Sequence, residues 1–385
     1  MRKKLYCGAI MPSRRRILQL APLLLGAALA PRFSFAQSSR HYSPSGTPLR
    51  RVNVSADRVI RTLVGLRPYR SSGFVVRAEK LGDKTVVHNY GHGGGGVTLS
   101  WGTAQLAAEL VPESQDKRCA VIGCGAVGLA SARLLQERGY QVRIYARDLP
   151  PNTTSNIAGA QWSPTSVFAP NNVSFEFLRQ FESAMRFSYR YYQTLLGERY
   201  GVRWITNYEF GDIPPAQDNV VDAYPDMFPG LAKLTAEQHP FRARVARRYD
   251  TMLIDPTFYL PALLEDFTSH GGEVVQRELK NQADIHSLEE ATIINCMGLG
   301  SGDIFVDPDL FPIKGQLLAL LPQEEVDYIA YSGGRSLFML PRKNEILLGS
   351  TFQRGQSTLT PDEGQSKRTL GDQKLLFDAM EDPWS

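Results

Sequence analysis

Cysteine and histidine are scarce in this chain of 385 residues, which has four of the first and six of the second. No H-E-x-x-H or comparable metal-ligand spacing occurs. Only Cys119, Cys124 and Cys296 follow the N-terminal region. Their odd number, and the position of two of them on or beside one apolar strand, argue against a disulfide framework or a metal cluster. We therefore expect free, buried cysteines and no metal site.

Strong charge of one sign and internal repetition are also lacking. The formal net charge is +4, and part of it lies in the first fifty residues, so the charge balance does not indicate a nucleic-acid partner. No internal repeat occurs, and no low-complexity segment follows the N-terminal region. A chain of this length can form two domains with substantial cores.

A long apolar run is found only near the N-terminus. Residues 13–19 (SRRRILQ) resemble a twin-arginine export signal, and an apolar run at 20–30 and a small-residue cleavage site at 34–36 follow. The run is too short for an ordinary membrane span. We expect residues 1–36 to be a signal peptide, with Met11 as an alternative start and a retained anchor as the other interpretation. The protein would then be periplasmic or secreted.

The most informative stretch is a glycine turn between an apolar strand and an Ala/Leu-rich helix. Gly123, Gly125 and Gly128 have the G-x-G-x-x-G spacing of a dinucleotide-binding turn. The first permits a tight turn, the second lets a pyrophosphate approach the backbone, and the third lets the helix pack closely on the strand. We expect the pyrophosphate at this helix N-terminus. The intervening residues that would share this contact are Cys124, Ala126 and Val127.

A second glycine run precedes the first one. It contains Gly93, Gly94, Gly95 and Gly96, with a helix expected from near Thr98. Four glycines let a backbone press against a flat or anionic ligand, and the helix directs its positive end to the same place. This combination favours a flavin, whose reduced ring carries negative charge. A mobile surface loop is the alternative interpretation.

The segment that follows the second nucleotide-domain strand, 141–146, carries further candidates. Arg147 and Asp148 lie where a ribose-binding acid is expected, about 20 residues beyond the last glycine. Small and hydroxyl residues then suit a cradle for phosphates and the flavin edge, although they could equally form a turn cluster without a ligand. These are Thr153, Thr154, Ser155, Gly159, Ala160 and Gln161.

Periodicity predicts alternating strands and helices over the rest of the chain. Strands are expected at 59–66, 74–81, 84–90, 202–210, 248–254, 273–276, 291–296, 317–321, 336–340 and 345–352. Helices are expected at 172–200, 257–270 and 362–380.

Together these stretches resemble the D-amino-acid oxidase family of FAD enzymes. The resemblance spans almost the whole chain after residue 36 and implies FAD as cofactor. It also implies an α/β fold with a Rossmann-type FAD-binding domain and a mixed-sheet, α+β substrate domain. The motifs are VIGCGAVGL at 121–129, YARDLP at 145–150, NCMGLG at 295–300, PR at 341–342, GLRP at 65–68 and HNYGHGG at 88–94.

The order of the motifs departs from that family, in which the arginine strand and the flavin loop come last. We interpret the chain as a circular permutation in which residues 111–117 join the usual C-terminal helix to the usual N-terminal strand. Because domain termini often lie close together, the helix ending at Met380 should lie near the strand beginning at about Val52. The expected division is a signal peptide at 1–36, a linker at 37–51, substrate-domain parts at 52–83, 166–256 and 316–385, and FAD-binding parts at 84–165 and 257–315.

The resemblance also implies a mechanism. Arg67 would bind the substrate carboxylate, and the carbonyl of Gly94 would accept a hydrogen bond from the substrate amine, so that hydride passes from Cα to flavin N5. O2 would be reduced to hydrogen peroxide, and the imino acid would hydrolyse to a 2-oxo acid and ammonia. Phe338 and Phe352 stand where relatives often carry tyrosine, which predicts a preference for neutral or apolar D-amino acids.

Other functions remain open at this point. They are a D-aspartate or glycine/sarcosine-type amine oxidase, a flavin dehydrogenase, a nicotinamide enzyme in which Arg147 binds a 2′-phosphate, and a catalytically silent exported FAD-binding protein. The expected partners are a small D-amino acid and O2, without nucleic acid and without a stable membrane span after leader cleavage. A homodimer is compatible with this interpretation.

Overall fold

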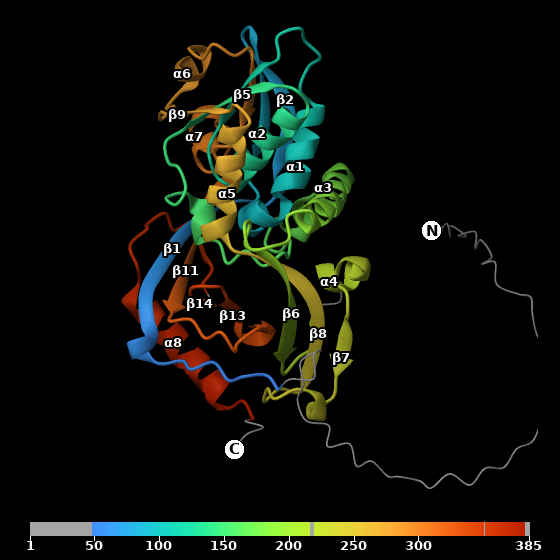
Figure 1. Cartoon of the computed structure of the whole chain (residues 1–385), viewed down its shortest axis with the longest axis vertical. Coiled ribbons are helices and arrows are strands. Elements are labelled where there is room, and N and C mark those ends of the chain that lie inside the picture. Colours follow the sequence, from blue (N-terminus) through green and yellow to red (C-terminus); the bar gives the residue numbers. More distant parts are fainter. Residues whose placement is uncertain (1–47, 216–218, 350, 382–385) are drawn as a thin grey trace, which may run out of the picture. The chain divides into compact units, whose positions relative to one another are not determined.

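The computed structural model describes residues 48–215, 219–349 and 351–381. The expected signal peptide at 1–36 and most of the expected linker at 37–51 lie outside these residues. The described part contains two β-sheets with helices packed against them (Figure 1). Within it, no helix is both long enough and apolar enough to cross a membrane.

The first sheet has six strands in the order β2-β3-β10-β4-β5-β9. Five of them are parallel, and β2 pairs antiparallel with β3 at one edge. The central strands β3, β4 and β10 are buried along almost their whole length, as is usual for a parallel sheet that helices cover on both faces. The strands are β2 (Val75–Leu81), β3 (Lys84–Tyr90), β4 (Arg118–Ile122), β5 (Gln141–Ala146), β9 (Glu273–Gln276) and β10 (Thr292–Asn295).

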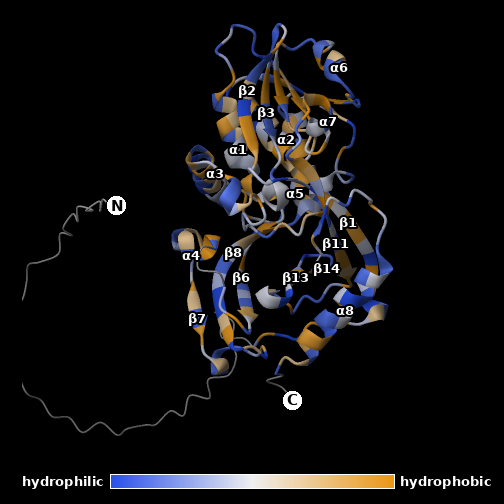
Figure 2. Ribbon diagram, turned by 180° about the vertical axis from the view of Figure 1, so that it is seen from behind, coloured by the Kyte–Doolittle hydropathy of each residue, from blue (hydrophilic) through white to orange (hydrophobic). Residues whose placement is uncertain are grey.

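Helices cover both faces of this sheet. One face packs against α1 (Gly96–Glu109), α2 (Ala126–Glu137) and α5 (Pro256–Ser269), and α3 (Phe175–Gln193) packs on α1. The other face packs against α6 (Gln282–His286) and α7 (Gly300–Phe305). Figure 2 shows apolar strands enclosed between these helices. The six-stranded sheet therefore has the layered α/β architecture expected from the sequence.

The second sheet has nine strands, eight of them in the order β1-β11-β14-β13-β12-β6-β8-β7, with the short β15 paired to β11. Helix α8 (Glu363–Asp378) packs against one face of it, and α4 (Val220–Ala223) lies beside β7 and β8 (Figure 1). The strands are β1 (Val59–Arg70), β6 (Val202–Gly211), β7 (Ala232–Leu234), β8 (Val245–Ile254), β11 (Leu310–Leu320), β12 (Ile329–Ser332), β13 (Leu337–Pro341), β14 (Ile346–Gly349) and β15 (Gln353–Arg354).

Several elements differ from the expected bounds, among them β1, α3 and β11. Strand β1 continues past residue 66 to Arg70, since Pro68 is tolerated in an edge strand. Helix α3 begins at Phe175 rather than 172, because the Ser174 side chain caps it by accepting a hydrogen bond from the Phe177 amide. Strand β11 begins at Leu310, seven residues before the expected start at 317.

The sheets also divide the chain differently from the expected domain bounds. Strand β2, placed by the sequence in the substrate-domain part 52–83, pairs with β3 and belongs to the six-stranded sheet. The expected bound between 315 and 316 falls within β11. Helix α3, placed in the part 166–256, packs on α1 of the six-stranded layer. The layer to which each of these elements belongs depends on packing partners that are distant in the sequence.

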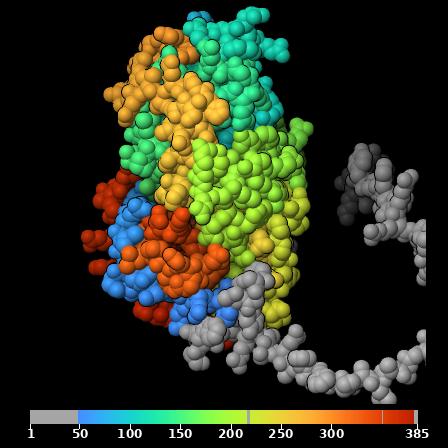
Figure 3. Space-filling view, in the orientation of Figure 1, coloured from blue at the N-terminus to red at the C-terminus, as the bar shows by residue number. Residues whose placement is uncertain are grey.

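The two ends of the described chain lie together. A guanidinium nitrogen of Arg51, Nη2, donates to the Met380 carbonyl oxygen at 2.8 Å. Val52 and Val54 share a buried cluster with Phe377 and Met380. Figure 3 shows the N-terminal β1 segment beside the C-terminal segments. The predicted closeness of Val52 and Met380 is confirmed.

The close approach of α1 and α3 gives a stability prediction. A Cβ at Gly102 would collide with the backbone of Ala184, whereas a Cβ at Gly371 in α8 meets nothing within 4 Å. Gly102→Ala should destabilise the protein by about 1–3 kcal/mol through overpacking. Gly371→Ala, also within a helix, should stabilise it by up to about 1 kcal/mol. Thermal unfolding midpoints of both variants check this, and equal midpoints would contradict it.

Candidate active site

A cavity of about 1870 Å³ is lined by residues of both sheets. It exceeds the roughly 300–1,000 Å³ that holds a drug-sized ligand. It therefore has room for a dinucleotide together with a small second molecule. Twenty of the twenty-one residue positions predicted from the sequence to bind cofactor or substrate line it, and Gly95 alone does not.

The turn between β4 and α2 forms one wall. Gly123 has φ +110°, and a Cβ there would lie 2.5 Å from the Cys296 carbonyl oxygen. A Cβ at Gly128 would collide with the Gly123 carbonyl oxygen. Helix α2 has no side-chain cap from Gly125 and no acidic residue in its first turn. Its positive end therefore lies at the cavity with no acidic residue of its own first turn, as an anion-binding site requires.

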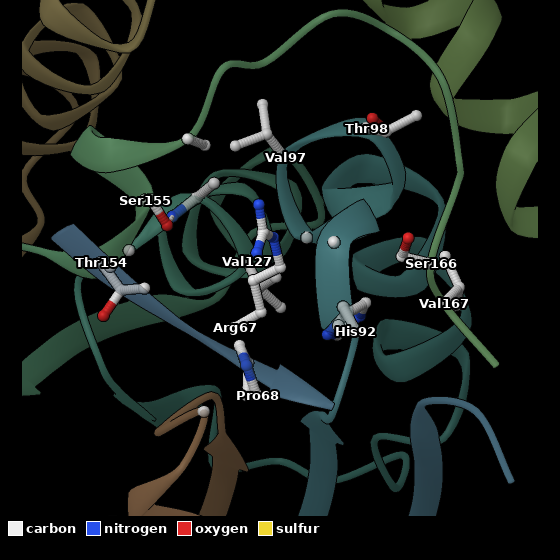
Figure 4. Close-up of a pocket in the computed structure, with 18 of the residues that line it drawn as sticks. Arg67, Pro68, His92, Val97, Thr98, Val127, Thr154, Ser155, Ser166 and Val167 are labelled. Carbon is white, nitrogen blue, oxygen red and sulfur yellow. Dashed lines mark hydrogen bonds between the residues drawn. The ribbon is translucent and has the colours of Figure 1, made fainter. Parts of the chain in front are cut away.

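The hydroxyl segment lies next to that helix start. The Ser155 hydroxyl accepts a hydrogen bond from the Ala126 amide at 3.0 Å. Thr153 and Asn156 form a capping box, and Thr154 and Ser155 both reach the cavity (Figure 4). Gly159, Ala160 and Gln161 continue the same wall.

Arg147 and Asp148 follow β5 at the rim of the cavity. Arg147 Nε donates to Asp148 Oδ2 at 2.8 Å, and both side chains are exposed. The sequence placed a ribose-binding acid here, and the structure brings this carboxylate to the cavity next to the glycine turn.

The second glycine run turns into α1. Gly93–Gly95 form a 3₁₀ turn, and α1 begins at Gly96, slightly before the expected start near Thr98. The Gly94 amide donates to the Ser166 carbonyl oxygen at 2.9 Å. Helix α1 also starts without a side-chain cap or an acidic residue in its first turn. Two helices therefore direct their positive ends to one cavity.

Gly95, which the sequence predicted to bind the cofactor, does not line the cavity. A Cβ there would lie 2.6 Å from a methyl carbon of Val167. Gly95 is buried and serves the packing of the loop rather than lining the cavity.

Arg67 lies in the middle of the cavity (Figure 4). Strand β1 pairs with β11 so that Gly65 faces Gly315, and the guanidinium of Arg67 covers Gly315. Within the part of the chain that the structure describes, its side chain makes a single long hydrogen bond, 3.4 Å, to the Thr351 carbonyl oxygen. No acidic side chain among the described residues pairs with it, and burial lowers its pKa. Arg67 is therefore a cation without a counterion, beside the ring of Phe352 at 5.8 Å.

Phe338 forms an apolar wall of the cavity. Its ring covers Gly349 on the neighbouring strand, where a Cβ would collide with it. It packs with a buried apolar cluster that includes Leu317 and Leu340. A group anchored at Arg67 would meet this wall within the same cavity.

The cavity's histidine does not offer a proton acceptor at ordinary pH. Burial lowers the pKa of His92 to about 3. Its Nε2 lies 2.9 Å from the Thr103 hydroxyl, and its ring stacks on Phe74. His92 is therefore a neutral, structural residue of the glycine loop.

A family model described as "FAD dependent oxidoreductase" matches residues 34–110 and 118–383. The chain belongs to the FAD-dependent oxidoreductase family. Its relatives include proteins that carry the name D-amino-acid oxidase. The one from Rubrobacter xylanophilus is 30% identical over 266 residues, 66% of this chain and 75% of that protein. The one from Streptomyces coelicolor is 28% identical over 254 residues, 65% of this chain and 74% of that protein.

A solved structure supports the fold of this family member. The iminodiacetate oxidase from Chelativorans sp. has a TM-score of 0.52 at 19% identity, with 68% of this chain and 79% of that one covered. At this identity the likeness concerns the fold alone. The expected fold class, a Rossmann-type FAD-binding layer with a second mixed sheet, is confirmed.

The residues of the cavity fit the family's cofactor, FAD. The glycine turn of β4–α2 would hold the pyrophosphate, because a side chain at Gly123 or Gly128 is excluded and the first residues of α2 line the cavity. Asp148 would contact the ribose, and the glycine loop before α1 would contact the flavin ring, since both line the cavity. Both helix ends favour a ligand that carries negative charge.

Sequence reasoning missed a polar part of the cavity. Asn207 and Glu209 on β6, Arg247 on β8 and Tyr331 on β12 all line it. Asn207 and Glu209 alternate with Tyr208 and Phe210, which are buried on the other face in a different cluster. This alternation in a predicted strand is the signal that could have found them.

The glycine turn gives a binding prediction. Gly128→Ala should weaken FAD binding at least about tenfold, because the added Cβ displaces the Gly123 carbonyl and opens the turn. Fluorescence titration of the apoprotein with FAD measures it, and Gly371→Ala is the control that should bind normally. A folded Gly128→Ala variant with unchanged affinity would refute the assignment.

Proposed function

We propose that this enzyme oxidises D-amino acids, yielding a 2-oxo acid, ammonia and hydrogen peroxide. The observation that carries the proposal is Arg67, a cation without a counterion in the same cavity as the FAD-binding turns. Leaving a charge unpaired away from water is costly, so an anionic group of the substrate is the natural partner. The names of the relatives support an amino acid as that substrate.

The residues of the chain would act by positioning. Arg67 presents a planar, two-pronged donor that holds a carboxylate in one orientation. The Gly94 carbonyl would accept from the substrate amine, and Phe338 would confine the side chain. Bound FAD supplies the hydride acceptor and passes the electrons to O2.

No protein base is needed for this reaction if the amine binds neutral. His92 is neutral and hydrogen-bonded, and its burial keeps it so. The energetic contribution of the protein then comes from orientation and from the positive helix ends.

The charges around the cavity favour a neutral substrate side chain. Arg247 is engaged by Glu209 at 2.7 Å and by Asp222 at 2.9 Å. It is therefore not free to bind a second carboxylate, which disfavours D-aspartate and D-glutamate.

We also propose that the chain is a circularly permuted member of its family, exported by the twin-arginine route. The family match falls into two segments that leave out 111–117, where the junction is placed. The contact between Arg51 and Met380 supports the permutation, because the family's usual order joins the segments that contain these two residues.

The function is tested by oxygen uptake and peroxide formation with matched D- and L-amino acids. The purified FAD-loaded enzyme should turn over D-alanine and D-leucine and leave the L-isomers and D-aspartate largely unused. Turnover with D-aspartate alone, or with L-isomers alone, would contradict the proposal.

Arg67→Lys should lower kcat/KM for D-alanine about 100-fold, mainly through KM, because a lysine cannot form the paired hydrogen bonds. Arg61→Lys on the same strand is the control, since Arg61 pairs with Glu345 outside the cavity at 2.6 Å. Equal effects of the two substitutions would show that Arg67 is not the anchor.

The pH profile provides a further prediction. Because the pKa of His92 is about 3, this residue stays neutral from pH 5 to 9. The logarithm of kcat/KM should rise with pH up to the pKa of the substrate's own ammonium group. Steady-state kinetics would show no break near pH 6.5. A break there that His92→Gln removes would assign a base to this histidine.

A further inference from the structure

The cavity has a polar end beyond its phenylalanine wall. Strand register places Tyr331 beside Phe338, and Glu209 beside Tyr331 on the next strand. Neighbouring strands lie about 4.8 Å apart, so Glu209 is about 10 Å from Phe338 across the sheet. All three residues line the cavity. A substrate side chain that passes the apolar wall therefore meets Glu209.

Asn207 lies on the same face of β6, two residues before Glu209, and it is 0% exposed. Its Oδ1 accepts a hydrogen bond from Gln161 Nε2 at 3.3 Å. Its Nδ2 has no hydrogen-bond partner among the described residues. Because buried polar groups are nearly always hydrogen-bonded, this N–H at the cavity wall points to a ligand that carries an acceptor.

Glu209 provides a hydrogen-bond acceptor, where Asn207 provides a donor. Arg247 Nε and Nη2 both approach Oε2, at 2.8 and 2.7 Å. The other oxygen, Oε1, has no partner among the described residues and remains as an acceptor at the cavity. Because Arg247 already balances the charge of Glu209, the attraction for a cationic side chain is weak.

We propose that Asn207 and Glu209 bind the carboxamide of a substrate side chain, as in D-asparagine or D-glutamine. Asn207 Nδ2 donates to the amide oxygen, and Glu209 Oε1 accepts from the amide nitrogen. The two residues are about 6.8 Å apart along the strand, which a carboxamide with a hydrogen bond of about 2.9 Å on each side can bridge. The assignment rests on the proposed oxidation of D-amino acids and names the preferred members of that class.

The first test compares two substrates of the same shape. D-Asparagine carries a planar carboxamide at the position where D-leucine carries an isopropyl group of similar size. The FAD-loaded enzyme should show at least about tenfold higher kcat/KM for D-asparagine, because leucine leaves both polar groups unpaired. A smaller ratio, or a higher kcat/KM for D-arginine than for D-asparagine and D-glutamine, overturns the proposal.

The second test needs no turnover. Succinamate is D-asparagine without its amino group, and 4-methylpentanoate is D-leucine without its amino group. Calorimetric titration gives the affinity of each acid for the FAD-loaded enzyme. Succinamate should bind at least about tenfold more tightly, although its side chain is less apolar. If no D-amino acid, D-alanine included, yields peroxide, the proposed function fails, and this binding comparison still decides the subsite.

Variants assign the preference to Asn207. In Asn207→Leu and in the isosteric Asn207→Asp, the D-asparagine to D-leucine ratio should fall to about one or below. Thr206→Val is the matched control, because Thr206 lies on the other face of β6 and bonds Asp250. Its ratio should equal that of the natural enzyme. A ratio unchanged in both Asn207 variants, or a loss of FAD affinity with the ratio kept, overturns the assignment.

Discussion

The antiparallel pairing of β1 with β11 is the constraint on which the site depends. It sets Gly65 opposite Gly315 and directs the Arg67 side chain over Gly315 into the cavity. A slip of one residue would turn Arg67 to the opposite face of the sheet. The same chain segment continues through the β2–β3 hairpin into the glycine loop before α1. One continuous stretch thus carries both Arg67, the proposed carboxylate-binding residue, and the loop proposed to contact the flavin.

Two arginines on strand β1 differ in whether the protein itself supplies a counterion. Arg70, three residues after Arg67 and on the other face, donates to Asp307 at 2.7 Å and lies 3.8 Å from Asp309. Its charge is balanced within the protein. Arg67 lies half-buried beside Phe352 with no counterion among the described residues, which costs free energy. In the proposed function, the substrate carboxylate would compensate this cost.

The sequence predicted those parts of the fold that depend on residues close together in the chain. The spacing of Gly123, Gly125 and Gly128 located the nucleotide turn, because steric limits act within a few residues. Strand β9 and helix α5 were placed to within one residue. Sheet membership was not predictable in this way, since β2 is assigned by its pairing with β3 and not by its own pattern.

The candidate site was predicted where a motif fixes the backbone and missed where the neighbours are distant in sequence. Arg67 was found through its motif, while Asn207 and Glu209 belong to a strand with no motif of its own. Their cavity position arises from strand order, which brings β6 next to β12 and not next to β1. Gly95 was misjudged because only the packing of Val167 reveals its role.

The central claim is that Arg67 holds a carboxylate next to the bound cofactor. Titration of the FAD-loaded enzyme with propanoate, followed by the visible absorption of the flavin, tests it most directly. A saturable spectral change that Arg67→Leu abolishes while FAD stays bound is the predicted result. No change in the natural enzyme, or the same change with the same affinity in the variant, would contradict the account.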